Sequence, residues 1–357
     1  MSKKKQKKII LTAGGTGGHL FPAQAVASDL AKEAEVLFVS GGLETSTFFD
    51  RQQFAFEEIS CATLSLKKPW RLVSEGAKIW RGVRQSYKIL EEFAPDTVVG
   101  FGSFFSLPML IAASRRKVPI ILHEQNAIPG KVNRLFSSRA QLTAITFPQS
   151  AHYLKGKSIE VLFPTKECRI MEEAWKYFGL KEELLTLLVF GGSAGARRLN
   201  QLILEAIPLL QGKLPPFQLI LLVGKHADIN AISKRLKELN IPFCVKEFEP
   251  QMEYAWSLAD IAITRAGAST INELIHYETP GILIPYPFAS DNHQAKNAEH
   301  FVNTVKGGEM FLEASLTPLS LVRSIIWIVE HRHYIQKRIH AYREGRTENK
   351  LANMILH

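Results

Sequence analysis

The sequence predicts an α/β protein made of two doubly wound, parallel-sheet domains, and three observations lead to this prediction. Its 357 residues exceed one ordinary domain and suffice for two that each bury a core. Short, nearly continuous apolar runs alternate with helical patterns, which is typical of parallel strands covered by helices on both faces. Finally, "LTAGGTGGH" at 11–19 resembles "LVFGGSAGARRLN" at 188–200, as expected of two related domains in tandem.

The apolar runs that we expect to form strands are divided equally between the two halves. They are residues 9–11, 35–40, 96–100 and 119–124, then 186–192, 218–224, 261–264 and 281–287. Pro164 interrupts the pattern in "VLFPTKE", so we expect one domain over 1–163 and a second over 164–340. The chain is helical from about 317 onward, and we expect the tail at 341–357 to pack back on the first domain.

Charge is distributed unevenly along the chain. Residues 1–163 hold 22 Lys and Arg against 13 Asp and Glu, whereas residues 164–357 hold 22 against 21. The basic excess favours an anionic partner of the first half: a nucleic acid, an acidic membrane surface or a phosphorylated lipid.

The three cysteines form no C-x-x-C pair and no D-x-D pair occurs, so neither a disulfide framework nor a metal-chelated diphosphate is predicted.

The glycine-rich loops that follow two of the predicted strands are candidates for binding phosphate. Glycine lets an anion approach backbone N–H groups at a helix N-terminus, where the helix dipole favours negative charge. The first loop holds Gly14, Gly15, Gly17 and Gly18, and is followed by His19, either a general base or a helix cap. Neither loop is a P-loop, and no acidic residue stands where an NAD-binding fold would need one, which weakens a dehydrogenase interpretation. The second loop offers Ser193, Arg197 and Arg198.

Two further polar clusters follow predicted strands, where ligands of parallel sheets bind. One is His123, Glu124, Gln125 and Asn126, whose side chains serve either a ligand or the ties between neighbouring loops. In the other, residues 268–270 open a helix and Glu273 lies one turn further on. Glu273 suits the two hydroxyls of a ribose, although it could equally cap the helix.

Residues 60–90 combine basic and aromatic side chains, with seven Lys and Arg against one Glu. This composition is typical of an interfacial membrane contact, although single-stranded nucleic acid or simple packing on the core would also fit it. The expected membrane-contact residues are Leu66, Trp70, Ile79, Trp80, Arg81 and Arg84.

Together these motifs resemble the MurG family of peptidoglycan N-acetylglucosaminyltransferases, over about residues 8–305. The resemblance is carried by "GGTGGHLFPAQAVA", "HEQNAIPGKVNR", "GGSAGARRLN" and "RAGASTINE" with Gln294 behind it. It implies a GT-B fold, in which two Rossmann-like domains face each other across a cleft that holds UDP-N-acetylglucosamine. The implied reaction inverts configuration, needs neither metal nor other cofactor, and transfers N-acetylglucosamine to the 4-hydroxyl of undecaprenyl-diphospho-N-acetylmuramoyl-pentapeptide.

The resemblance also implies roles for individual residues. The catalytic base is His19, with Glu124 as a competitor. Substrate contacts are expected from Thr16, Gly17, Gly18, Asn126, Lys166, Ser193, Ala268, Ser269, Thr270, Glu273 and Gln294. The chain departs from the family at Ser103 and Phe104, where relatives usually have a Gly-Gly-Tyr-like segment, and at Lys166, where an arginine is common.

The resemblance finally places the enzyme peripherally on the cytoplasmic face of the inner membrane, against an anionic surface and without a nucleic acid partner. Two alternatives stay open. One is another membrane-associated glycolipid glycosyltransferase of the GT-B fold, and the other is a non-catalytic UDP-sugar-binding subunit.

Overall fold

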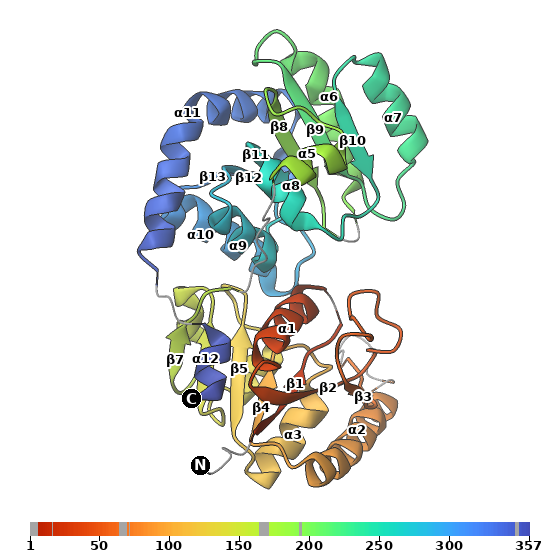
Figure 1. The fold of residues 1–357 in the computed structure, drawn as a ribbon, viewed down its shortest axis with the longest axis vertical. Coiled ribbons are helices and arrows are strands. Elements are labelled where there is room, and N and C mark those ends of the chain that lie inside the picture. Colours follow the sequence, from red (N-terminus) through yellow and green to blue (C-terminus); the bar gives the residue numbers. More distant parts are fainter. Residues whose placement is uncertain are drawn as a thin grey trace. The chain divides into compact units, whose positions relative to one another are not determined.

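The computed structural model describes residues 6–15, 17–63, 70, 72–163, 171–192, 195–346 and 350–357. The chain divides into two compact units (Figure 1). The first unit comprises Met1–Pro164 together with Thr347–His357, and the second comprises Thr165–Arg346. The last helix, α12 (Leu351–Leu356), therefore belongs to the first unit, and the chain joins that unit again at Thr347 rather than at the expected residue 341.

The first unit is built on a parallel sheet in the order β3-β2-β1-β4-β5-β6-β7. The strand order reverses beside β1, so the helices that follow β1 and β4 cover opposite faces of the sheet. Ligands of such sheets bind at the carboxyl edge beside this reversal. The elements are β1 (Lys7–Thr12), α1 (Gly17–Leu30), β2 (Ala34–Ser40), β3 (Phe56–Glu58), α2 (Leu72–Phe93), β4 (Thr97–Gly100), α3 (Leu107–Arg116), β5 (Ile120–Glu124), α4 (Lys131–Phe136), β6 (Leu142–Ile145) and β7 (Ser158–Glu160).

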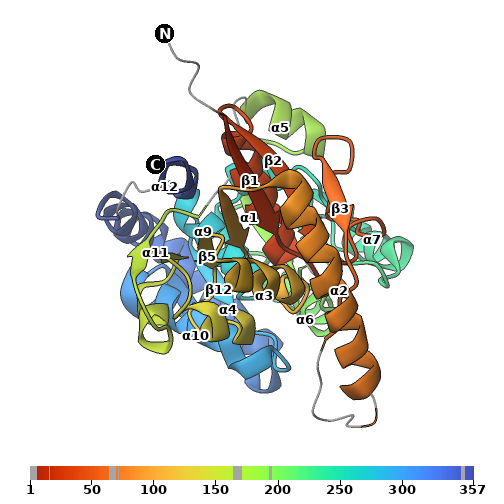
Figure 2. The ribbon, with the colours of Figure 1, turned by 90° about the horizontal axis from the view of Figure 1, so that it is seen from below.

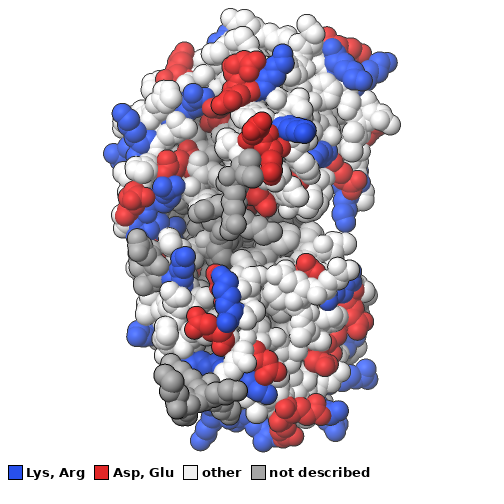
Figure 3. Space-filling view, viewed as in Figure 1, with Lys and Arg blue, Asp and Glu red and all other residues white. Residues whose placement is uncertain are grey.

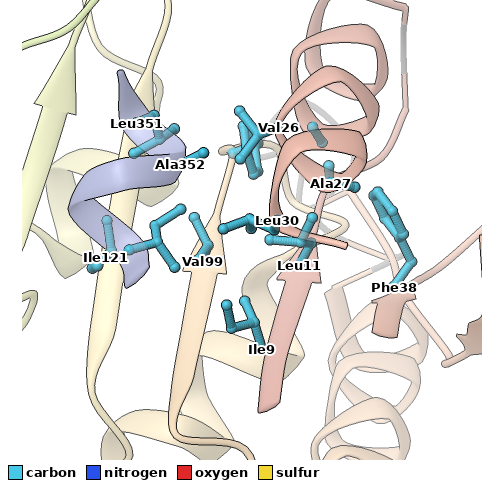
Figure 4. Packing of buried hydrophobic residues seen from close by; sticks show 14 of the residues in the cluster. Ile9, Leu11, Val26, Ala27, Leu30, Phe38, Val99, Ile121, Leu351 and Ala352 are labelled. Carbon is cyan, nitrogen blue, oxygen red and sulfur yellow. The ribbon is translucent and has the colours of Figure 1, made fainter. Parts of the chain in front are cut away.

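Helices cover both faces of this sheet. Alternate residues of β1 point to opposite faces, so Ile9 and Leu11 pack against α1 and α12, while Ile10 packs against the other layer. Figure 4 shows α1 and α12 meeting over the first face, with Leu351 and Ala352 among the buried side chains. The opposite face is covered by α2, α3 and α4, and α2 and α3 lie side by side there (Figure 2).

The second unit repeats the architecture with a parallel sheet in the order β10-β9-β8-β11-β12-β13. Its order reverses beside β8, which occupies the position that β1 has in the first unit. The elements are α5 (Met171–Phe178), β8 (Leu185–Phe190), α6 (Arg197–Leu210), β9 (Phe217–Leu222), α7 (Ile229–Glu238), β10 (Phe243–Lys246), α8 (Met252–Leu258), β11 (Ile261–Thr264), α9 (Ala268–His276), β12 (Gly281–Leu283), α10 (His293–His300), β13 (Gly308–Met310) and α11 (Pro318–Glu344).

Burial explains why these segments fold as they do. All six residues of β8 are buried, as expected of a central strand covered on both faces. Helix α6 buries Leu199, Leu202, Ile203, Ala206 and Leu210, at the three- and four-residue spacing of one helix face. Helix α11 packs against α6 and begins with a capping box, in which the Thr317 hydroxyl accepts a hydrogen bond from the Ser320 N–H. The predicted class, two doubly wound parallel-sheet domains, is confirmed.

Candidate active site

The loop after β1 is packed tightly against the loop after β4. A Cβ atom on Gly14 would lie 2.7 Å from Phe105 Cβ and 2.9 Å from Ser40 Oγ, so no larger residue fits without movement. Phe105 is fixed in turn, because its carbonyl oxygen accepts hydrogen bonds from Ser40 Oγ and Cys61 Sγ. The first glycine of this loop therefore serves the close approach of two loops at the reversal point of the sheet.

His19 lies in the first turn of α1, two residues after the helix begins at Gly17. Its side chain is partly exposed, and Gly18 beside it is exposed. The electrostatic influence of His19 reaches His123, at the end of β5, and helps to lower the pKa of that imidazole. The structure thus brings the histidine of the glycine loop close to the polar cluster that follows β5.

His123 is completely buried, and this burial, more than the charge of His19, lowers its pKa to about 3. The ring is therefore neutral at physiological pH. It lies beside the Phe101 ring, and Nε2 is 3.4 Å from the Thr146 hydroxyl. Nδ1 has no hydrogen-bond partner in the described part of the chain.

Glu124 is buried and both of its carboxylate oxygens accept hydrogen bonds. Oε1 accepts from the Asn126 N–H at 2.9 Å, and Oε2 accepts from the Gly130 N–H at 2.9 Å and from Asn133 Nδ2 at 2.8 Å. Burial raises the pKa of Glu124, while these donors act in the opposite direction. The carboxylate therefore holds the loop between β5 and α4 in one conformation, and this loop presents Asn126.

Asn133 was not singled out from the sequence, although it lies within the quoted motif. Its Nδ2 also donates to the His123 carbonyl oxygen at 2.9 Å, so it ties α4 to the end of β5. Gln125 is likewise buried, and its Oε1 has no hydrogen-bond partner among the described residues. An amide oxygen left unpaired at the carboxyl edge is a costly feature unless a ligand or water meets it.

In the second unit, the loop after β8 is also built around a close approach. Gly195 has φ +76°, and a Cβ there would lie 2.6 Å from the carbonyl oxygen of Val223. Helix α6 then begins at Arg197, and the side chains of Arg197 and Arg198 are exposed. Basic residues at a helix N-terminus oppose the helix dipole, so their presence there favours a bound anion over a purely structural role.

Helix α9 begins at Ala268, as predicted, and places Glu273 in its second turn. Ala268 is buried, whereas Ser269 and Thr270 are partly exposed. Burial raises the pKa of Glu273 to about 7, and the nearby Glu253 carboxylate adds to this, while the Trp256 indole lowers it. Trp256 Nε1 nevertheless makes no hydrogen bond of normal geometry with any described residue, so this carboxylate is far less satisfied than Glu124.

Gln294, in the first turn of α10, fixes the loop after β12. Its Oε1 accepts a hydrogen bond from the Tyr286 N–H at 2.9 Å. Arg265 holds the same loop. Its Nη1 donates hydrogen bonds to the carbonyl oxygens of Ile284 and Pro285 and lies 2.5 Å from Glu313 Oε2. Arg265 was not predicted as a site residue, and the signal for it is a charged residue directly after a buried strand.

Several predicted residues do not join these groups. Thr16, Lys166, Ser193 and Leu66 lie outside the described residues. Ile79, a residue of α2, is only 9% exposed and its side chain packs in the core between the helix and the sheet. The expectation that it contacts a membrane is therefore wrong. Its position on the inner face of the helix explains this. Trp70, Trp80, Arg81 and Arg84 are exposed.

The described residues contain neither a metal-binding cluster nor a membrane-spanning helix. No group of three or more His, Cys, Asp and Glu side chains in this part of the chain is placed to hold a metal ion. Across the same residues, no helix combines the length and the apolar character needed to cross a membrane.

Comparison with known proteins identifies the family. Residues 9–145 match the glycosyltransferase family 28 N-terminal domain, and residues 186–354 match its C-terminal domain. A UDP-N-acetylglucosamine--N-acetylmuramyl-(pentapeptide) pyrophosphoryl-undecaprenol N-acetylglucosamine transferase of Protochlamydia amoebophila is 41% identical, over 98% of this chain and 95% of the relative. The protein of the same name from Chlamydia felis is 33% identical, over 99% of both chains.

Solved structures support the fold. MurG of Acinetobacter baumannii superimposes with a TM-score of 0.76 at 24% identity, and the match covers 98% of both chains. The glycotransferase of kitacinnamycin gives a TM-score of 0.74 at 17% identity over 99% of both chains. Because these relatives are 41% and 33% identical over nearly the whole chain, this protein belongs to the MurG family of N-acetylglucosamine transferases, within glycosyltransferase family 28.

Proposed function

We propose that this chain transfers N-acetylglucosamine from UDP-N-acetylglucosamine to the 4-hydroxyl of undecaprenyl-diphospho-N-acetylmuramoyl-pentapeptide, giving lipid II for peptidoglycan synthesis. The observation that carries this proposal is the 41% identity to a transferase of that name, which extends over 98% of the chain and so includes both sheets. In the reaction, the acceptor oxygen bonds to the anomeric carbon as the bond from that carbon to UDP breaks, and the configuration inverts.

The base that removes the acceptor proton is His19 in this proposal. An imidazole is the side chain best suited to general-base catalysis near neutral pH, and His19 is partly exposed at the edge where ligands bind. Glu124 is less suitable, because hydrogen bonds already occupy both of its oxygens. Its role is that of a positioning residue for Asn126, which would contact the donor sugar.

The second unit would bind the donor. The N-terminus of α9, at Ala268, Ser269 and Thr270, would face the nucleoside, and Glu273 would accept hydrogen bonds from the ribose hydroxyls. The Gln294 amide nitrogen donates no hydrogen bond to a described residue and would serve the sugar. The N-terminus of α6, with Arg197 and Arg198, would stabilise the departing diphosphate. By resemblance, Thr16, Gly17, Gly18, Ser193 and Lys166 would complete the donor contacts.

The first unit would bind the acceptor and the membrane. We place the enzyme peripherally on the cytoplasmic face of the inner membrane, where its acceptor's lipid diphosphate lies. Trp70 and Trp80 are exposed, and Arg81 and Arg84 lie on the same stretch of chain. Tryptophan and arginine together suit the boundary between anionic headgroups and acyl chains.

The decisive experiment is label transfer from UDP-N-acetylglucosamine to a lipid-linked N-acetylmuramoyl-pentapeptide by the purified full chain. We expect turnover, competed by unlabelled UDP-N-acetylglucosamine and far more weakly by UDP-glucose or UDP-galactose. A folded protein that binds UDP without any transfer would overturn the proposal in favour of a binding subunit. Preference for another UDP-sugar would indicate a different glycolipid glycosyltransferase.

A further inference from the structure

The loop that joins β12 to α10 exposes two aromatic rings. Tyr286 is 44% exposed and Phe288 is 82% exposed. The rings meet edge to face, with centroids 5.7 Å apart and an angle of 70° between their planes. No other phenylalanine in the described part of the chain is more than 48% exposed. Two neighbouring rings left open to solvent at the carboxyl edge of a parallel sheet indicate a contact surface.

The backbone fixes this aromatic pair in place. The Ala289 N–H donates to the Tyr286 carbonyl oxygen at 3.2 Å, which closes a β-turn. Pro287 takes the second position of the turn, where its fixed φ is favoured, and Phe288 takes the third. The Arg265 guanidinium lies 5.6 Å from the centroid of the Tyr286 ring and supports it. The rings are therefore preorganised, with Phe288 at the tip of the turn.

Polar side chains lie beside the aromatic pair. Asp291 and Asn292 are exposed and have left-handed backbones, with φ of +51° and +54°. Such conformations of residues other than glycine concentrate where ligands bind. The Gln294 side chain lies next to Tyr286, because its Oε1 accepts a hydrogen bond from the Tyr286 N–H. Aromatic rings beside carboxylate and amide groups suit a sugar, which has C–H groups on its ring faces and hydroxyls at its rim.

Other ligands fit this loop less well. An anionic membrane surface attracts basic side chains, whereas residues 284–292 include no Lys or Arg and one carboxylate, Asp291. On the face of the second unit that Figure 3 shows, basic and acidic side chains are interspersed. The donor nucleoside is proposed to bind at the N-terminus of α9, which follows β11 rather than β12. A neutral, hydroxylated ligand therefore fits the loop best.

The position of the pair beside Gln294 selects between two sugars. In the proposed reaction, Gln294 contacts the N-acetylglucosamine that is transferred. Gln294 is only partly exposed in the first turn of α10, whereas Phe288 projects from the tip of its turn. The acceptor sugar lies directly beside the transferred sugar, because the reaction joins the two rings through one oxygen. The ring that extends beyond Gln294 toward Phe288 is thus that of the acceptor.

We infer that Tyr286 and Phe288 bind the N-acetylmuramoyl ring of the acceptor by stacking against one of its faces. This inference rests on the proposed function and assigns part of acceptor recognition to the second unit. The aromatic pair positions the acceptor and takes no part in proton transfer. Its loss should therefore weaken acceptor binding and leave kcat almost unchanged.

The test is calorimetric titration of the full chain with a short-chain, water-soluble acceptor in the presence of UDP, which carries no sugar to transfer. Phe288→Ala should raise the acceptor Kd about tenfold, because an aromatic stack is lost. Phe288→Leu keeps apolar surface but no flat ring and should raise the Kd about fivefold, whereas Phe288→Trp should stay within about twofold. The matched control Tyr334→Ala removes a ring that is 64% exposed on α11, and we expect a change of less than about twofold.

Two comparisons identify the group that is bound. The Kd of UDP-N-acetylglucosamine should change by less than about twofold in Phe288→Ala, since the pair is not assigned to the donor. An acceptor whose peptide stem is shortened to one residue should show the same loss as the full acceptor, since its sugar ring is retained. A loss confined to the donor, or one that disappears with the shortened stem, would overturn the inference. So would a wild-type acceptor Kd in Phe288→Ala or in Phe288→Leu.

Turnover is measured separately, by label transfer at saturating acceptor, and Phe288→Ala should keep kcat within about twofold of wild type. Acceptor binding by the wild-type chain without transfer would overturn the proposed function and leave the role of the aromatic pair intact. Transfer with an unchanged acceptor Kd in every Phe288 variant would overturn the role of the pair alone. Melting temperatures verify that each variant is folded.

Discussion

Two carboxylates at the carboxyl edges of the two sheets, Glu124 and Glu273, have contrasting environments. Burial raises the pKa of both groups. Glu124 accepts hydrogen bonds from two backbone N–H groups and one side-chain amide at 2.8–2.9 Å. Glu273 instead has an indole nearby and a second carboxylate, Glu253, that disfavours its charge. Both oxygens of Glu124 therefore accept hydrogen bonds within the protein, whereas the hydrogen-bonding capacity of Glu273 is not met in this way.

The difference indicates how each edge works. At the first edge, Glu124, Asn133 and buried His123 form a rigid frame, which fixes a loop before any substrate arrives. At the second edge, Glu273 and the exposed Arg197 and Arg198 have few internal partners and would gain them from a nucleotide. The first edge is therefore preorganised for chemistry, and the second is completed by binding.

The largest effect is expected at His19, the partly exposed ionisable group of the preorganised edge. His19→Ala should lower kcat by about 10²- to 10⁴-fold, because it removes the proposed base, while the free energy of unfolding changes by less than about 1 kcal/mol. Rates of label transfer and chemical denaturation together measure this. A decrease in kcat of under tenfold would show that the first edge supplies no base through His19.

The next effect is expected at Glu124 itself. Glu124→Gln turns an N–H group toward donors that need an acceptor, so we expect the free energy of unfolding to fall by about 3 kcal/mol. The matched change Glu273→Gln should cost less than about 1 kcal/mol at pH 7, since that carboxylate has few partners to lose. Urea denaturation of both variants tests the contrast directly, and equal losses would contradict it.

A smaller effect is expected in the loop after β8, where replacing either of two glycines by alanine should lower the stability by different amounts. Gly195→Ala should destabilise the protein by about 2–3 kcal/mol, because φ is +76° and the new Cβ meets the Val223 carbonyl oxygen at 2.6 Å. Gly192→Ala is the control, since φ is +81° but no atom of the described residues, apart from Gly192 and its chain neighbours, lies within 4 Å of the new Cβ. We expect it to cost about 1 kcal/mol. Thermal unfolding of both variants measures the difference, and identical melting temperatures would show that the loop relaxes freely.

Most central strands could be predicted from the sequence, although the central strand β6 (Leu142–Ile145) was missed, and the four edge strands could not. All eight predicted apolar runs contain a strand, because strands covered on both faces are apolar throughout. The strands that were missed include β3, β7, β10 and β13, which lie at the sheet edges. They are three or four residues long and only partly buried, as in "FEE" and "SIE", so no continuous apolar run marks them.

The sequence was enough to predict which polar residues cluster at the site, but not which hydrogen bonds form between them. The position at the carboxyl end of a buried strand was enough to select His123 and Glu124. The partners of Glu124 lie two to nine residues further on, and only the path of the chain into α4 brings Gly130 and Asn133 back to it. Arg265 was missed for the same reason, because its acceptors, the carbonyl oxygens of Ile284 and Pro285, belong to a different strand connection.

The smallest effect is a pH dependence at the edge completed by binding. In the free protein the pKa of Glu273 is raised from 4.5 to about 7, so its contribution to stability is present below about pH 4.5 and is lost as the pH rises through 7. Ribose hydroxyls would donate to the ionised form, so UDP-N-acetylglucosamine should bind more weakly as the pH falls below 7. About a tenth of the groups are ionised one unit below the pKa, which predicts a Kd about tenfold higher at pH 6 than at pH 8. Calorimetric titration of wild type and Glu273→Gln measures this, and we expect the variant's Kd to be independent of pH over the range. The same slope in both proteins would assign the titration to another group and remove Glu273 from the proposed ribose contact.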